Sequence, residues 1–359
     1  MSVLSILSVF FALYILWGIL ISRFGLKGLS CTRAFSKPAF FEGEDGEMIE
    51  VVRNDRLMLI PWLRVESRIP AALQLGRQDN LLVSDRTHAC SLFTLMPFQQ
   101  IRRRHKVRFA RRGAYNLGKA TLTAGDILNA FQTSLEQDMD VPVLVYPRLL
   151  EEGEIPEPLF QLMGDIVSRR NLLSDPFLIR GIRPYQIGDS VRDIHWPATA
   201  RTGDVQVRVH DHTAQPRLLV VLNSQRKDGQ WSDRLMDYEE GEIEHEIALA
   251  ATLCIRALRA GLCAGFAANM PLDKEIPEST ILLPEGGAAR EEELLAAFAR
   301  LCILRTDSYH ELLSSLCGCS GLCILALSCY TNERIEAALS ALRRSGNHAE
   351  LCLLGGGAA

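Results

Sequence analysis

The stretch Leu218-Leu219-Val220-Val221-Leu222 is an uninterrupted apolar run in the carboxyl-terminal half of the 359-residue chain. Such a run is typical of a β-strand that is covered on both faces, as the strands of parallel sheets are. A helical pattern follows over residues 239–260, where Ile243, Ile247 and Cys254 share one face and Gly261 marks the end. A covered strand followed by an amphipathic helix predicts the start of an α/β domain.

The same alternation continues toward the end of the chain. We expect further strands at residues 262–268, 322–327 and 350–354, and further helices at residues 290–300, around His310 and around Leu339. Strands that alternate with helices favour a doubly wound parallel sheet. The sequence therefore predicts a doubly wound α/β domain over residues 213–359.

Shorter strand-like runs precede this domain. Residues 48–53, 62–67, 106–110 and 143–146 have the composition and spacing of strands, and turn residues separate them. They predict a small β-rich domain, a sandwich or a barrel, over residues 29–150. Residues 151–212 are then predicted to form a linker, with a helix that starts near Pro158 and an irregular polar segment from residue 175 onward.

The amino-terminal segment is apolar from residue 3 to residue 21, and Arg23 is the first charged residue. A helix of this length spans roughly 28 Å, close to the thickness of the hydrocarbon core of a bilayer. The segment has neither a basic start nor a small-residue cleavage site, so we expect a retained single-pass anchor in the cell membrane, within residues 1–28. Because Lys27 and Lys37 also follow the apolar run, the positive-inside rule favours a cytoplasmic body. A body on the outer face stays open.

The composition disfavours several classes of protein. Hydrophobic residues make up 48% of the chain and charged residues 23%, as in a globular protein, and the net charge of −4 argues against nucleic-acid binding. Most of the ten cysteines lie in apolar stretches after residue 250, which indicates reduced, buried thiols. The spacing of Cys317, Cys319, Cys323 and Cys329 does not fit a zinc site. Because the sequence also carries no nucleotide-binding or hydrolase motif, we expect no cofactor and no enzymatic activity.

A basic run lies in the β-rich region. It contains Arg102, Arg103, Arg104 and Lys106, and no acidic residue interrupts it. One interpretation is a solvated strand face on an otherwise acidic protein. The other is a surface that contacts anionic lipid head groups, because the predicted anchor keeps this domain near the membrane. The sequence leaves both open.

The densest polar cluster lies between residues 175 and 210, which hold five arginines, four aspartates and no lysine. Arginine without lysine indicates bidentate pairing with carboxylates. Trp196 adds a large apolar surface that is expected to pack onto a neighbouring domain. The candidate residues are Arg183, Pro184, Tyr185, Gly188, Asp189, Arg192, Asp193, His195, Trp196 and Arg201.

Three interpretations of this cluster are open. The first is a structural ion-pair network that fixes the segment between the two domains. The second is a surface that binds a partner protein. The third is an enzyme site that uses His195 with Asp193 or Asp189, and it is disfavoured because the sequence shows no nucleophile with a paired base.

The string RPYQxGDxxRxIxWxxxAR, from Arg183 to Arg201, resembles the signature of the bacterial family called domain of unknown function 58. An apolar amino terminus, the stretches at residues 111–115 and 145–148, and a terminal α/β domain occur in the order of that family. The resemblance implies a von Willebrand factor type A-like carboxyl domain. It also implies association with MoxR-type AAA ATPases, which act as chaperones in assembling or activating client proteins. Two features depart from the family: the chain shows one membrane helix where many members have two, and Pro197 stands where a lysine is common.

A type A domain usually holds a divalent metal with a D-x-S-x-S loop after its first strand. The corresponding positions here are Asn223, Gln225 and Lys227, with Ser224 between the first two. The carboxylate that a hard cation prefers is replaced by an amide, and a cation occupies the last position. We therefore expect no metal at this loop.

These observations predict a membrane-anchored, non-enzymatic adaptor that works with a MoxR-type ATPase on an unknown client protein. One alternative is a metal-dependent adhesion module on the outer face, which would need the opposite topology and an intact metal loop. Another is a membrane-surface scaffold for a different partner.

Overall fold

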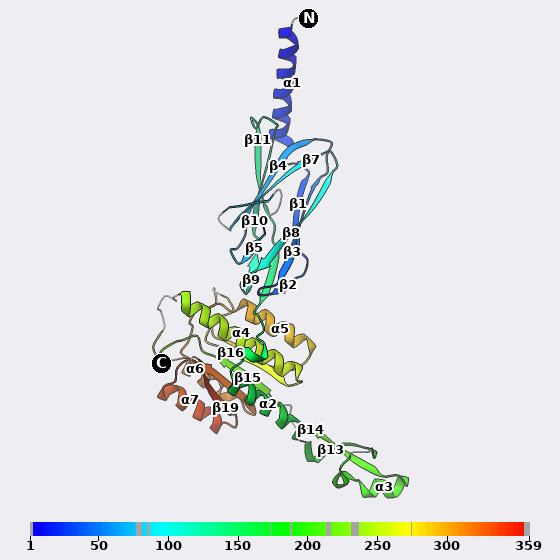
Figure 1. Cartoon of the computed structure of the whole chain (residues 1–359), viewed down its shortest axis with the longest axis vertical. Coiled ribbons are helices and arrows are strands. Elements are labelled where there is room, and N and C mark those ends of the chain that lie inside the picture. Colours follow the sequence, from blue (N-terminus) through cyan, green and yellow to red (C-terminus); the bar gives the residue numbers. More distant parts are fainter. Residues whose placement is uncertain are drawn as a thin grey trace. The chain divides into compact units, whose positions relative to one another are not determined.

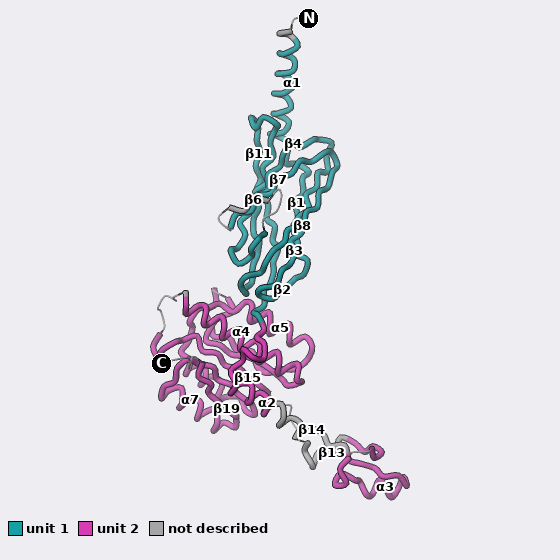
Figure 2. The backbone as a smooth tube through the Cα atoms, viewed as in Figure 1, with its two compact units in different colours: residues 1–148 teal, residues 149–359 magenta. Residues whose placement is uncertain are grey.

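The computed structural model describes residues 3–76, 81–84, 87–172, 174–186, 189–212, 217–230, 237–273 and 275–354. The chain divides into two compact units, Met1–Arg148 and Leu149–Ala359 (Figure 2). Each unit has its own hydrophobic clusters.

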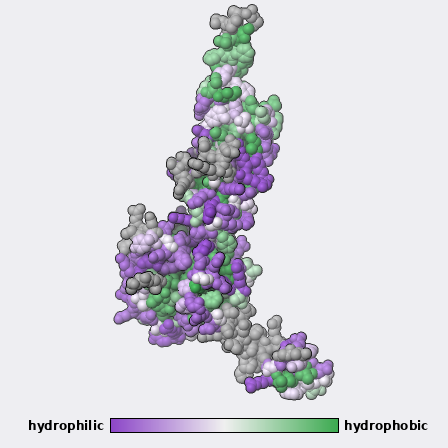
Figure 3. Space-filling view, in the orientation of Figure 1, coloured by the Kyte–Doolittle hydropathy of each residue, from purple (hydrophilic) through white to green (hydrophobic). Residues whose placement is uncertain are grey.

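The first unit begins with helix α1 (Val3–Phe24). Among the described residues it is the one helix that is long and apolar enough to cross a membrane, over Ile6–Phe24. The described side chains of α1 give the green, hydrophobic region next to the grey end of the surface in Figure 3, and most of them are exposed. The structure therefore contains the apolar helix that the sequence predicted.

The rest of the first unit is β-rich, as predicted (Figure 1). Its strands form three sheets, with the orders β1-β3-β8-β5, β11-β10-β4-β7-β6 and β2-β12-β9. The strands are β1 (Leu29–Phe35), β2 (Ala39–Phe41), β3 (Asp45–Asn54), β4 (Ile60–Arg68), β5 (Leu73–Leu75), β6 (Leu81–Ser84), β7 (His88–Leu95), β8 (Gln100–Phe109), β9 (Gly113–Asn116), β10 (Lys119–Gly125), β11 (Gln132–Asp138) and β12 (Pro142–Tyr146). Alternate residues point into the core: Val107 and Phe109 of β8 are buried, while Lys106 and Arg108 are exposed.

The second unit starts with the one-turn 3₁₀ helix η1 (Glu152–Glu154) and helix α2 (Glu157–Leu172), which the sequence had placed near Pro158. The segment expected to be irregular is instead a β-hairpin. Strand β13 (Ser174–Pro184) pairs antiparallel with β14 (Gln206–His212), and helix α3 (Trp196–Thr202) lies in the connection. The prediction was wrong here because two register shifts in β13 break the alternation by which a strand is recognised.

The α/β part of the second unit is built on a five-stranded sheet with the order β17-β16-β15-β18-β19. Four strands are parallel: β15 (Arg217–Leu222), β16 (Cys263–Ala268), β18 (Leu322–Ser328) and β19 (His348–Leu353). Strand β17 (Thr280–Glu285), which the sequence analysis missed, pairs antiparallel with β16 at one edge. The helices are α4 (Asp237–Arg259), α5 (Ala288–Arg300), α6 (Tyr309–Ser315) and α7 (Glu333–Arg344), and the 3₁₀ turn η3 (Leu316–Gly318) follows α6.

Helices cover both faces of this sheet (Figure 1). Leu218, Val220 and Leu222 of β15 pack with α4 and α5, whereas Leu219 and Val221 pack with α6 and α7. The alternating side chains of one apolar strand thus supply two cores, which explains why the run contains no polar residue.

Candidate functional site

The strand order of the sheet indicates that a ligand-binding site would lie at the carboxyl ends of β15 and β18. From β15 the chain first builds the sheet in one direction, through β16 and β17, and then returns to the other side to add β18 and β19. Open α/β sheets bind ligands at such a switch point, in the crevice outside the carboxyl ends of the strands. The loop that follows β15 begins with Asn223, and the loop that follows β18 begins with Cys329.

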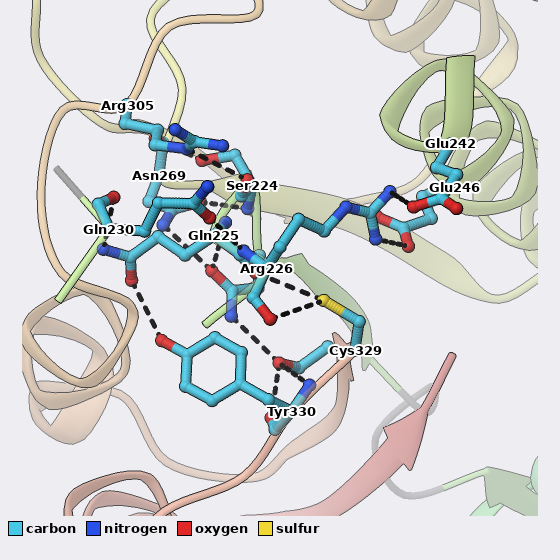
Figure 4. Close-up of polar contacts among 12 residues, drawn as sticks. Ser224, Gln225, Arg226, Gln230, Glu242, Glu246, Asn269, Arg305, Cys329 and Tyr330 are labelled. Atoms are coloured by element: carbon cyan, nitrogen blue, oxygen red, sulfur yellow. Dashed lines mark hydrogen bonds and ion pairs between the residues drawn. The ribbon is translucent and has the colours of Figure 1, made fainter. Parts of the chain in front are cut away.

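A buried network of amides occupies this edge (Figure 4). The Asn223 side-chain nitrogen donates to Ser328 Oγ (2.9 Å). The Asn223 oxygen accepts from the backbone nitrogen of Gln225 (3.0 Å) and from Nδ2 of Asn269 (3.1 Å). Asn269 in turn accepts from the backbone nitrogen of Ser224 (2.7 Å). Neutral side chains therefore connect the ends of β15, β16 and β18.

These residues do not fit a divalent cation. The Asn223 oxygen already accepts two N–H groups, and Gln225 Oε1 accepts from Tyr309 N (3.1 Å) and from the Tyr330 hydroxyl (3.3 Å). Lys227 is exposed. Within the described ranges, no group of three or more His, Cys, Asp and Glu residues could hold a metal ion.

Arg226 links this network to a pocket of about 950 Å³ in the second unit. Its Nη1 lies 2.5 Å from Glu246 Oε1, and its Nη2 lies 3.1 Å from Glu242 Oε2 (Figure 4). Burial raises the pKa of Glu246, although the neighbouring Arg226 opposes this effect. Arg226, Glu242 and Glu246 all line the pocket, so its wall presents charges of both signs, and His245 lies in the same lining.

The candidate cluster around Arg183 forms a second polar site, on the β13–β14 hairpin. The Arg183 guanidinium donates through Nη1 and Nη2 to the two Asp189 oxygens, both at 2.7 Å, and Asp189 also accepts from Gln186 N (2.8 Å). The Arg183 hydrogen bonds hold the pKa of Asp189 below its usual value. This geometry is the bidentate pairing that favours arginine over lysine.

His195 has a structural task in this segment. Its Nδ1 accepts a hydrogen bond from Ala198 N (3.0 Å), which places the ring at the start of α3. Its backbone nitrogen donates to Gln206 O (2.8 Å), so it also joins α3 to β14. A ring nitrogen that accepts from the backbone is occupied, and this contact does not favour the use of His195 as a general base.

The other candidates of this segment lie near its surface. Pro184 is the last residue of β13, Arg192 and Arg201 are exposed, and Asp193 is half-buried. Gly188 lies outside the described residues. The exposed apolar side chains of the segment include Trp196, Val191 and Tyr185, at exposed fractions of 64%, 70% and 42%. The segment thus pairs its central ionic groups internally and presents apolar side chains to solvent.

The basic run falls on strand β8, which divides it between two faces. Arg102, Arg104 and Lys106 are on the exposed face. Arg103 points to the other face, where its guanidinium carbon lies 3.9 Å from the centre of the Phe93 ring. Arg103 therefore does not share a surface with the other three.

Sequence reasoning missed a buried ionic cluster in the first unit. Glu50 Oε1 accepts from Arg33 Nε (2.9 Å) and Nη2 (2.6 Å), and Glu50 Oε2 lies 3.2 Å from His105 Nε2. Arg33 also donates to Ser67 Oγ (2.5 Å). The signal was weak: the Glu50 position falls within a predicted strand, and its partners lie on strands β1 and β8.

Comparisons with known proteins bear on part of the chain. Residues 181–278 match the family model described as "Protein of unknown function DUF58". The match supports the family resemblance of the Arg183–Arg201 motif, and it extends through β16. A search of curated proteins found no match.

Solved structures resemble the chain only weakly. They include the MG7-to-carboxyl-terminus region of α-2-macroglobulin from Escherichia coli (11% identity, TM-score 0.25, covering 32% of this chain and 23% of that one). A CARDB domain from Pyrococcus furiosus has 11% identity and a TM-score of 0.20, covering 33% of this chain and 90% of that one. A non-cellulosomal cohesin from Archaeoglobus fulgidus has 8% identity and a TM-score of 0.22, covering 32% and 91%.

Proposed function

We propose that this protein is a membrane-anchored, non-enzymatic adaptor that binds a MoxR-type AAA ATPase through the β13–β14 hairpin. The match of residues 181–278 to the family model supports the family part of this proposal. The observation that carries the binding surface is the exposure of Trp196, Val191 and Tyr185 beside the Arg183–Asp189 pair.

The chemistry of the hairpin supports a protein partner. Large apolar side chains at 64% and 70% exposure cost free energy in water, and such groups are buried when a partner covers them. Tryptophan and tyrosine are also the residues that most often dominate binding energy at protein interfaces. The Arg183–Asp189 pair and the His195 cap hold the backbone that carries these side chains, so little order has to be gained on binding.

We further propose that the α/β part is von Willebrand factor A-like and acts without a metal. The strand order and the helices on both faces support the first statement. The amide network at Asn223 supports the second, because its acceptors are used internally. This network also disfavours the alternative of a metal-dependent adhesion module.

The proposal is tested by capture of a MoxR-type ATPase from the same organism on the tagged full-length protein in mild detergent. We expect Trp196→Ala to weaken capture at least about 10-fold, as loss of a central aromatic residue does at protein interfaces. The matched control is Leu283→Ala, which removes an apolar side chain of 42% exposure from β17. Equal capture by the Trp196→Ala variant and the unaltered protein, with unchanged thermal unfolding, would show that the hairpin is not the binding surface.

A further inference from the structure

The carboxyl-terminal half of helix α1 packs against the β10–β11 hairpin. The Tyr14 ring lies edge-on to the Phe131 ring, with 6.2 Å between the ring centres, and the Tyr14 hydroxyl donates to the Asp126 carboxylate. At Gly18 an added Cβ would lie 2.1 Å from the Phe131 ring, so the helix needs a glycine there. Ile21 is only 1% exposed. These residues recur at helical spacing and form one stripe of contact with the body of the first unit.

The position of this contact along α1 is unexpected for a simple anchor. Tyr14 lies nine residues before Arg23, which corresponds to about 14 Å of helix. The apolar stretch Ile6–Phe24 would need its whole length to cross a hydrocarbon core of about 30 Å. A membrane crossed by this stretch would therefore have Tyr14 near its middle, and the hairpin tip that contacts Tyr14 would lie inside it.

The hairpin tip, residues 126–131, has properties that suit a position inside a lipid bilayer. Ile127 is 77% exposed and Leu128 is 70% exposed. The Asp126 carboxylate accepts from the backbone nitrogens of Leu128 (3.2 Å) and Phe131 (2.7 Å), and Asp126 O accepts from Asn129 N (3.1 Å), so several backbone N–H groups of the turn are paired within it. Each such pairing lowers the cost of bringing a polar backbone group toward lipid, where no water replaces a lost hydrogen bond.

Two further loops carry exposed apolar residues near the base of α1. Asp55 N donates to Gly28 O (3.1 Å), and Phe98 N donates to Arg56 O (3.1 Å), which places both loops beside the chain just after the helix. Leu57 is 79% exposed and Phe98 is 68% exposed. Apolar and aromatic side chains at this level suit the boundary between head groups and hydrocarbon.

We propose that the tip of the β10–β11 hairpin enters the lipid bilayer beside α1, in the leaflet on the side of the protein body. The occupant of this apolar surface is lipid, because the tip is continuous with the helix that would cross the membrane and lies at the depth of its middle residues. The inference rests on the proposed membrane anchoring. It makes the anchor a two-part element, a helix and a β-hairpin tip, joined by the contacts of Tyr14 and Gly18.

The test uses a photo-crosslinking amino acid placed at one of three sites in the full-length protein, reconstituted in phosphatidylcholine–phosphatidylglycerol vesicles. The sites are Ile127 at the tip, Leu16 on the exposed side of α1, and Asp138 at the other end of β11. Asp138 lies seven residues from Phe131, roughly 20 Å along the strand, and serves as the matched control. Mass spectrometry then measures the lipid adduct at each site.

We expect lipid adducts at Leu16 and at Ile127 in comparable yield, and a near-complete loss of adduct at Asp138. Adducts at Leu16 without adducts at Ile127 would overturn this inference and leave the membrane anchoring in place. A loss of adducts at both sites would overturn the anchoring and the inference together. Adducts in equal yield at all three sites would show contact with lipid that is not specific to the tip, and would also overturn the inference.

Discussion

Two arginine–carboxylate pairs of this protein have the same chemistry and opposite surroundings. Arg33 and Glu50 lie 2.6 Å apart in the first unit, with side chains that are 1% and 0% exposed. Arg183 and Asp189 lie 2.7 Å apart in the β13–β14 hairpin, with side chains that are 38% and 17% exposed. The distances are nearly equal, so the two pairs differ in how far their side chains are exposed to solvent.

The buried pair is expected to matter for stability. Removing two charges from water is costly, and the cost is offset only when their remaining hydrogen-bonding groups are also satisfied. Ser67 and His105 supply these contacts, on strands β4 and β8. The exposed pair competes with water and salt, so it contributes little to stability. The Arg183–Asp189 pair instead holds the backbone beside Tyr185 in place. One pair therefore acts on folding and the other on surface geometry.

The largest expected effect is that of Glu50→Gln. The substitution keeps the size of the side chain and removes the charge, which leaves Arg33 buried without its carboxylate. We expect the free energy of unfolding of the first unit to fall by about 3–5 kcal/mol, as when one partner of a buried pair is lost. Urea unfolding of the full chain in detergent, followed by circular dichroism, measures this.

The matched control is Glu47→Gln, three positions before Glu50 on the same strand. Glu47 lies 3.8 Å from Arg104, and both side chains are largely exposed. We expect this change to have little effect, because exposed pairs contribute at most about 1 kcal/mol. Equal losses for the two variants would mean that burial does not distinguish the pairs.

A second prediction concerns the loss of stability at acidic pH. Burial alone would raise the pKa of Glu50, but the hydrogen bonds and charges of His105 and Arg33 outweigh it and lower the pKa to about 2. The folded protein therefore holds Glu50 ionised more strongly than the unfolded chain does. The resulting stability, about 3 kcal/mol, is present above about pH 4.5 and is lost as the pH falls toward 2.

This pH dependence is tested by measuring the free energy of unfolding of the unaltered protein and of the Glu50→Gln variant between pH 6 and pH 2. We expect the difference in free energy between the two to shrink as the pH falls, because protonation makes Glu50 resemble glutamine. A difference that stays constant over the whole range would contradict the assignment of the acid sensitivity to Glu50.

The sequence predicts a feature well when the residues that form it are close together in the chain, and poorly when they are far apart. The run 218–222 and the helical stripe through Ile243 are local patterns, and the structure has β15 and α4 there. Strand β17 was missed because it is only partly buried and its apolar run is shorter than that of β15, although the two strands have the same length. The β13–β14 hairpin was missed because its bulges and its two prolines hide the alternation.

The polar sites were harder to predict, for the same reason. Asn223 was noted for the carboxylate it lacks, but its partners Asn269 and Ser328 come from other strands, far along the chain. Glu50 meets Arg33 only through the register of β1 on β3. A sequence states which residues follow each other, and these contacts depend on which strands lie next to each other.

The smallest expected effect on stability is that of Asp189→Asn, at the exposed pair. The change removes the charge that pairs with Arg183 and lowers the number of strong hydrogen bonds in the loop. Because water and salt already screen this pair, we expect the melting temperature to change far less than in Glu50→Gln. Capture of the ATPase should weaken nonetheless, though less than in Trp196→Ala, because the loop that carries Tyr185 loses its fixed shape. The control is Asp204→Asn, at another exposed position of the same hairpin. A large loss of stability with unaltered capture would reverse the roles assigned to the two pairs, since the exposed pair would then act on folding.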